Sequence, residues 1–156
     1  MIQRIQSVFL LLLALCMLSL VALPLWHKAD PLTQQEMTMS AWGYTTTTGL
    51  AAPAGPVWVV GVLALASAAV AVFEIFQFRN RLTQLKLGML NLLLIISVFG
   101  AGYTFAGRGE NALKPILEGQ FLPAFYLPTL ALLLNLLANR FIRSDERLVR
   151  SADRLR

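Results

Sequence analysis

Cysteine, histidine and charged residues are all scarce in this chain of 156 residues. The single cysteine, Cys16, excludes an intrachain disulfide, and the single histidine, His27, excludes a histidine cluster that could hold a metal. Charged residues make up 13% of the chain and hydrophobic residues 57%, whereas soluble domains have about 25% and about 45–50%. This composition is typical of a one-domain integral membrane protein. The net charge of +5 does not indicate nucleic-acid binding, because the basic residues flank the apolar runs.

Sequence motifs that carry known chemistry are also missing. The chain has no glycine-rich phosphate loop with a lysine, no His-Glu-x-x-His and no cysteine pair. Four-helix disulfide enzymes that use quinone and claudin-like proteins both need such cysteine pairs, so both classes are excluded. We therefore expect a protein that is not an enzyme, with no catalytic residue, no metal and no cofactor.

Four apolar runs are each long enough to cross a bilayer. A helix of about 20 residues matches a hydrocarbon core of roughly 30 Å. The predicted spans are residues 7–26, 57–78, 87–105 and 121–141. The first exceeds the apolar core of a signal peptide, and we expect Trp26 to close it at the membrane interface. The predicted fold class is an all-α membrane protein, a four-transmembrane-helix bundle in one domain of residues 1–156.

The connections contain two local signals. Residues 37–48 (MTMSAWGYTTTT), within the long first loop of residues 28–56, are rich in β-branched and aromatic residues. They fit a short β-hairpin over the outer helix ends, or an irregular loop with Trp42 and Tyr44 in the membrane interface. Residues 107–120 are expected to form a second outer loop. In the fourth span, Pro128 should kink the helix or loosen its first turns.

Lysine and arginine are distributed unequally between the two sides of the predicted bundle. Ten lie on the side of both termini and three on the other. The ten are Arg4, Arg79, Arg81, Lys86, Arg140, Arg143, Arg147, Arg150, Arg154 and Arg156, and the three are Lys28, Arg108 and Lys114. Since cytoplasmic loops carry the excess of positive charge, both termini are expected to be cytoplasmic.

The tail, residues 143–156, repeats after seven residues as RSDERLV and RSADRLR. Two repeats are too few to indicate a coiled coil. We interpret the tail as a short surface helix whose basic face contacts anionic lipid. Docking to a protein partner is the alternative. The predicted contact residues are Arg143, Arg147, Arg150 and Arg154.

The second span carries small residues at helical spacing. Gly61, Ala64, Ala68 and Ala71 form one stripe, which favours close packing with another helix. Alanine is also a common helix residue, and that is the simpler interpretation. Glu74 lies at the edge of the stripe. It is either a structural anchor, paired with an arginine or with polar groups, or a proton or ligand site inside the bundle.

Polar residues of three spans are predicted to gather in the cytoplasmic third of the bundle. Such a cluster either fixes the helix register or forms a small internal site open to the cytoplasm. The prediction fails if Asn135 and Asn139 face lipid while Glu74 faces elsewhere. The predicted cluster is Glu74, Gln77, Asn91, Asn135 and Asn139.

Both ends of the chain resemble a known family. MIQRIQSVFLLL, residues 1–12, and DERLVRSADRLR, residues 145–156, are similar to the opening and the ending of a small four-span family of the Bacteroidota. That family is a domain of unknown function, number 4293. The resemblance extends over the whole chain in span number and spacing, and it is specific at the two ends. It implies a protein of the bacterial inner membrane, and it brings no known activity and no site residue.

The leading functional hypothesis is a non-enzymatic accessory or scaffold subunit of a larger inner-membrane assembly. The expected partners are membrane lipids and other membrane subunits, and a homo-oligomer is compatible with the sequence. The first alternative is a small oligomeric transporter or channel that uses Glu74. A membrane enzyme acting on lipid or quinone is the third.

Overall fold

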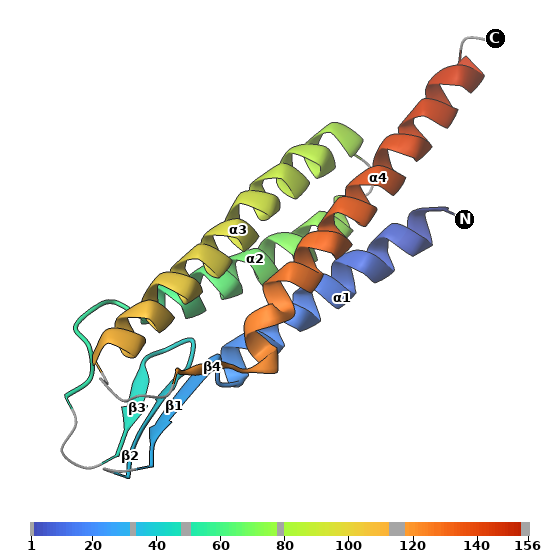
Figure 1. The fold of residues 1–156 in the computed structure, drawn as a ribbon. Helices are drawn as coiled ribbons and strands as arrows, with labels where there is room; N and C mark the ends of the chain where they lie inside the picture. The colour runs from blue at the N-terminus through green and yellow to red at the C-terminus, as the bar shows by residue number, and fades with distance from the viewer. Residues whose placement is uncertain (1, 32–33, 48–50, 78–79, 113–117, 154–156) are drawn as a thin grey trace.

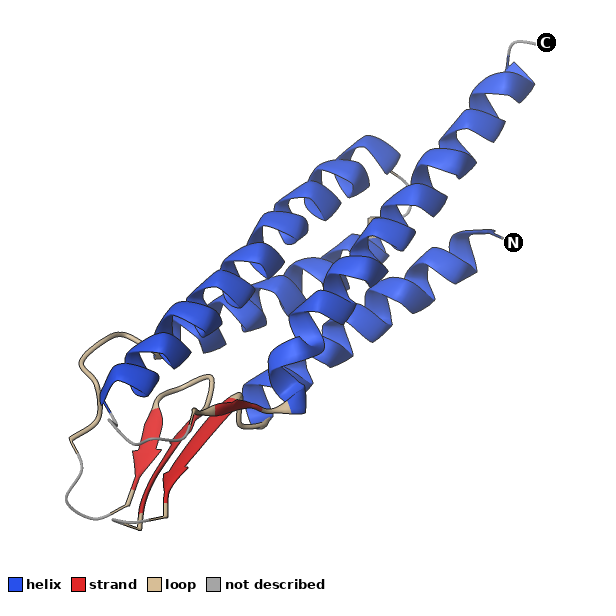
Figure 2. Ribbon diagram, viewed as in Figure 1, coloured by secondary structure: helices blue, strands red, loops and turns tan. Residues whose placement is uncertain are grey.

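Four long helices form a bundle, and a small antiparallel sheet covers one of its ends (Figures 1 and 2). The computed structural model describes residues 2–31, 34–47, 51–77, 80–112 and 118–153. The first half of the chain contains α1 (Ile2–Ala22), β1 (Trp26–Asp30), β2 (Gln35–Met39), β3 (Tyr44–Thr46) and α2 (Trp58–Phe76). The second half contains α3 (Arg81–Ala112), β4 (Gln120–Phe121), the 3₁₀-helix η1 (Pro123–Tyr126) and α4 (Leu127–Asp153).

Each of the four long helices contains a segment that is long and apolar enough to cross a membrane. In the bundle α1 packs against α2 and α4, and α3 packs against the same two helices. The start of α1 and the end of α4 lie at the end opposite the sheet (Figure 1). The prediction of four apolar helices in one bundle is therefore confirmed.

Helix α3 is longer than the predicted third span. Its 32 residues extend about 48 Å at the usual helical rise. The expectation of a second outer loop from residue 107 was wrong, because the helix continues to Ala112. The sheet supports this last part of α3: the indole of Trp26 packs against Gly109, and Lys28 contacts Glu110.

Helix α1 ends at Ala22, shortly before Pro24. Proline removes a backbone donor and disfavours helix in the residue before it. The chain then becomes extended, so that Trp26 is the first residue of β1, and its side chain is only 1% exposed. The expectation that Trp26 closes the first span at the membrane interface was wrong.

The sheet has four strands in the order β3-β2-β1-β4, and each neighbouring pair is antiparallel. The predicted hairpin is confirmed: β2 and β3 pair with Met39 opposite Tyr44, and the turn is held by the Ser40 N–H, which donates to the Gly43 carbonyl at 2.9 Å. Strands β1 and β4 were not predicted. Tyr44 is half-buried against the bundle, which excludes the irregular-loop alternative for that residue.

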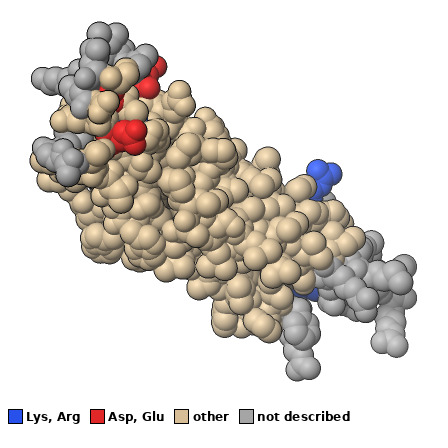
Figure 3. Space-filling model, turned by 90° about the horizontal axis from the view of Figure 1, so that it is seen from below, with Lys and Arg blue, Asp and Glu red and all other residues tan. Residues whose placement is uncertain are grey.

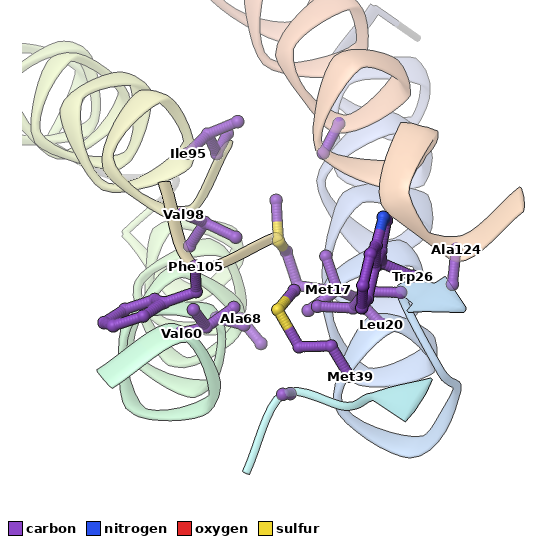
Figure 4. Packing of buried hydrophobic residues seen from close by; sticks show 14 of the residues in the cluster. Met17, Leu20, Trp26, Met39, Val60, Ala68, Ile95, Val98, Phe105 and Ala124 are labelled. Carbon is purple, nitrogen blue, oxygen red and sulfur yellow. The ribbon is translucent and has the colours of Figure 1, made fainter. Parts of the chain in front are cut away.

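The core of the bundle lies under the sheet. Alternation along β1 and β2 directs Trp26, Met37 and Met39 toward the helices, where they are buried. Figure 4 shows Trp26 and Met39 beside Met17 and Leu20 of α1 and near apolar side chains of α2 and α3. The half of the bundle next to the sheet is therefore filled by apolar side chains.

Helix α4 begins and ends differently from the predicted fourth span. The 3₁₀ turn η1 precedes it, and Pro128 occupies its second position, so the loosened first turns expected from this proline are present. At its other end α4 continues without a break to Asp153 and projects past the other helices (Figure 1). The predicted tail helix is thus an extension of α4, not a separate surface helix.

Candidate functional site: buried polar groups at the end opposite the sheet

One face of α3 organises the polar residues inside the bundle. Its buried positions recur at alternating spacings of four and three, which keeps them in line along the helix. Gln84, Gly88 and Asn91 are the first three of these positions. Each of them meets a polar group from another helix, so the polar contacts span two turns of α3.

The first contact joins three helices. Gln6 of α1 donates its side-chain N–H to Gln84 Oε1 at 3.4 Å, and Gln84 Nε2 donates to the backbone carbonyl of Glu74 at 3.4 Å. All three residues are buried. The carbonyl lies in the last turn of α2 and also accepts the backbone N–H of Gln77 at 3.2 Å. Gln84 is therefore its second donor, and it links the end of α2 to α1.

The second contact joins α2 to α3. The Ser67 hydroxyl donates to Asn91 Oδ1 at 2.6 Å, and both residues are fully buried. Between apolar helices such a bond fixes the register, because a slip of either helix would leave both groups unpaired.

The third contact brings α4 against α3. Asn139 Nδ2 donates to Asn135 Oδ1 at 2.7 Å, one turn apart on α4. The Asn139 amide lies against Gly88: an added Cβ there would be 2.2 Å from Asn139 Oδ1. Because Gly88 has no side chain, it leaves room on the surface of α3 for the amide of Asn139.

Glu74 differs from the other buried polar residues. Its side chain is 0% exposed, and within the described residues neither carboxylate oxygen has a hydrogen-bond partner. The same is true of Asn91 Nδ2, Asn135 Nδ2 and Asn139 Oδ1. Since buried polar atoms are ordinarily paired, these atoms could hold water, a proton or a small polar ligand between the helices.

Four of the five predicted cluster residues are buried inside the bundle, namely Glu74, Asn91, Asn135 and Asn139. Gln77 is not one of them: it is the half-buried C-cap of α2, and its side chain makes no hydrogen bond within the described residues. The four do not form one connected network, because Asn91 bonds to Ser67 and the two α4 asparagines bond to each other.

Sequence reasoning missed Gln84, which was assigned to a loop, and did not include Gln6 or Ser67 in the cluster. One signal was present for Gln84: it lies seven residues before Asn91, which places both on one face of a helix. The loop assignment hid this spacing, because α3 begins at Arg81, before the predicted span.

The predicted packing stripe on α2 is buried along its length. Ala64, Ala68 and Ala71 are at most 4% exposed. Gly61 meets the loop before β3 and not another helix: its N–H donates to the Ala41 carbonyl at 3.0 Å. An added Cβ at Gly61 would be 3.0 Å from the Trp42 ring. The stripe therefore serves helix packing at its centre and sheet attachment at its start.

The opposite end of the bundle is held by contacts to the sheet. Lys28, 3% exposed, forms an ion pair with Glu110, whose other carboxylate oxygen accepts the Gly119 N–H at 2.9 Å. The Tyr44 hydroxyl donates to the Phe105 carbonyl at 2.5 Å. Burial raises the pKa of Tyr44, and the nearby positive charge of Arg108 partly opposes that rise.

The predicted tail contacts are placed only in part. Arg143 is exposed on α4, just beyond the predicted fourth span. Arg147 and Arg150 lie on the helical extension, and Arg154 lies outside the described residues.

Within the described part of the chain, no group of three His, Cys, Asp or Glu residues could hold a metal ion.

Fold and site together define a class: four long apolar helices, an antiparallel sheet over one end and buried polar groups toward the other. The particular family follows from comparison, because the model of the domain of unknown function DUF4293 matches residues 2–155. The chain belongs to that family, as the resemblance of its two ends indicated. Comparison with curated proteins and with solved structures gives no match.

Proposed function

We propose that the protein is a multi-pass component of a bacterial inner membrane with both termini in the cytoplasm. Large apolar side chains point outward from all four helices, and no more than 44% of any apolar segment is buried within the described bundle. Acidic side chains are visible at the sheet end and basic ones at the opposite end (Figure 3). This charge distribution supports the proposed orientation.

We further propose that it acts as a non-enzymatic accessory or scaffold subunit of a larger membrane assembly. The observation that carries this proposal is the extension of α4, which continues past residue 141, the end of the predicted fourth span, to Asp153. A helix that projects from its own bundle offers a surface to another subunit. The apolar core under the sheet supports the same proposal, because apolar side chains fill the described bundle next to the sheet.

The test is gentle extraction of the tagged protein from its native membrane, followed by mass spectrometry of the proteins that stay bound. We expect one partner at fixed stoichiometry with the full chain, and its loss when the chain ends at Ser144. The variant Arg147→Gln with Arg150→Gln keeps the helix and removes two charges, so it tells whether the partner is held by these predicted contact residues or by the rest of the extension. A homo-oligomer or a lone monomer from the full chain would refute the accessory role.

A second function is favoured by one observation: the buried carboxylate of Glu74 has no hydrogen-bond partner among the residues that the structure describes. In an oligomeric transporter or channel this group would carry a proton or hold a cation between helices. Flux in proteoliposomes that is lost in Glu74→Gln and kept in Glu36→Gln, an exposed carboxylate of β2, would favour this function. Equal flux in both variants and in empty vesicles would exclude it. A membrane enzyme acting on lipid or quinone has no supporting observation among the described residues.

A further inference from the structure

A groove follows the seam between α3 and α4 near the end of the bundle opposite the sheet. Its volume is about 480 Å³. Its lining includes Met89 and Leu92 of α3 and Leu136, Arg140, Arg143 and Ser144 of α4. These residues come from the two helices that the Gly88–Asn139 contact brings together, so the floor of the groove is fixed by the packing of the bundle.

The groove has an apolar part and a basic part. Met89 is 60% exposed and Leu136 is 47% exposed, so both present apolar surface to the outside. Arg140 lies one turn after Leu136 on the same helix face, and Arg143 follows three residues later. Both arginines are exposed. Neither forms an ion pair with the described residues, and the described lining contains no acidic side chain.

The position of this change from apolar to basic is informative. Arg140 and Arg143 are the first basic residues after the apolar run of α4, and they lie at the end of the predicted fourth span, residues 121–141. That is the depth at which phospholipid headgroups meet the hydrocarbon core. Guanidinium groups bind phosphate with two parallel hydrogen bonds, and the Ser144 hydroxyl adds a donor at the same level.

We propose that this groove binds one anionic phospholipid of the cytoplasmic leaflet. Its phosphate is held by Arg140, Arg143 and Ser144, and an acyl chain lies along Met89, Leu92 and Leu136. The charge complementarity and the apolar continuation select a lipid over a soluble anion. This inference rests on the proposed membrane orientation, and it adds Arg140 and Ser144 to the predicted tail residues.

Lys86 provides a matched control for general electrostatic attraction. It is exposed on α3, three residues before Met89, at the same end of the bundle, and it is not part of the groove lining. Arg140→Gln and Lys86→Gln therefore remove one positive charge from the same level of the proposed bilayer. Only the first removes a donor from the groove.

The experiment is native mass spectrometry of the full chain in detergent, titrated with phosphatidylglycerol or with phosphatidylcholine. We expect tighter binding of phosphatidylglycerol, and weakening by roughly 30-fold in Arg140→Gln/Arg143→Gln at about 1 kcal/mol per arginine. Lys86→Gln should change the affinity less than twofold. Met89→Trp, which fills the apolar part, should also weaken lipid binding, while inorganic phosphate should not displace the lipid.

Several results would overturn the proposal. Equal affinity for the two lipids would show that charge is not recognised. Equal effects of Arg140→Gln and Lys86→Gln would show general attraction without a site. Displacement of the lipid by inorganic phosphate would show a soluble-anion site instead. Retention of the protein in membranes after carbonate washing tests the membrane proposal separately, and partner capture tests the accessory role.

Discussion

The side-chain amide of Asn139 occupies the space beside Gly88 that a Cβ atom would need. The ideal Cβ position at Gly88 is 2.2 Å from Asn139 Oδ1 and 2.9 Å from Asn139 Cγ. Asn139 is 9% exposed and bonded to Asn135, so its amide cannot leave without breaking that bond. A residue with no side chain on one helix thus determines where a polar residue of another helix is buried.

Gly88→Ala should therefore push α4 away from α3. Overpacking of this kind costs about 1–3 kcal/mol, and we expect a lower melting temperature in detergent. Gly100→Ala is the control, because an added Cβ at Gly100 meets nothing within 4 Å. The double variant Gly88→Ala/Asn139→Ala should recover part of the loss. If both single glycine variants melt alike, the close contact is not a constraint.

Glu110→Ala should loosen the sheet from α3. It leaves the ammonium of Lys28 buried without its carboxylate, at a cost of about 1.5–3 kcal/mol for a hydrogen bond to a charged group. Lys28→Met should cost less, because it removes the buried charge and leaves Glu110 bonded to the Gly119 N–H. Hydrogen exchange of β1 and β2 amides measures the effect. A larger loss of amide protection in Lys28→Met than in Glu110→Ala would contradict this account.

Glu74→Gln should leave the bundle folded and at least as stable. A carboxylate buried without a hydrogen-bond partner costs free energy, and the amide keeps its shape without the charge. Asn91→Leu is the comparison, because it removes the acceptor of the Ser67 hydroxyl and should cost about 1–3 kcal/mol. Thermal unfolding in detergent measures both. A clear fall in melting temperature for Glu74→Gln would show that the carboxylate has a structural partner.

Tyr44 should make stability depend on pH at the alkaline end. Burial raises its pKa above the ordinary value of 10.0. The contribution of Tyr44 is therefore fully present below pH 10 and is lost as pH rises through the pKa of the folded state. Tyr44→Phe should cost about 0.5–1.5 kcal/mol at neutral pH and show a smaller alkaline loss than the original protein. If the melting temperatures of Tyr44→Phe and of the original protein fall by the same amount between pH 9 and 11, this prediction is contradicted.

The long helices were predictable because their signal is local. Runs of about 20 apolar residues define a spanning helix without reference to any partner, and α2 followed the expected limits closely. Helix α1 was predicted too, but it begins five residues and ends four residues before the predicted limits. The ends of α3 and α4 were not predictable in this way. Gln84 and Glu110 are polar, so the sequence placed them in loops between the predicted spans. In the structure both are helical, and each is held by contacts to another element, Gln84 to α1 and α2 and Glu110 to β1.

The sequence predicted the level of the candidate site along the bundle, but it did not predict which side chains form hydrogen bonds there. The antiparallel order of the spans placed Glu74, Asn91, Asn135 and Asn139 at one level, and all four are buried. Which of them would bond was decided by helix rotation, since the Ser67–Asn91 bond depends on how α2 faces α3. A sequence gives the spacing within a helix, whereas the rotation between helices results from packing.

The sequence by itself determined four apolar helices, the β-branched and aromatic composition that favours the β2–β3 hairpin, and the unequal distribution of basic charge. These are properties of segments, fixed by residue type and by period along the chain. Only the tertiary structure decided the pairing of Trp26 with Phe121 across β1 and β4, the burial of Lys28 against Glu110 and the fit of Asn139 against Gly88. Each joins residues at least 51 positions apart, and such contacts form only when the whole bundle fixes the positions of both partners.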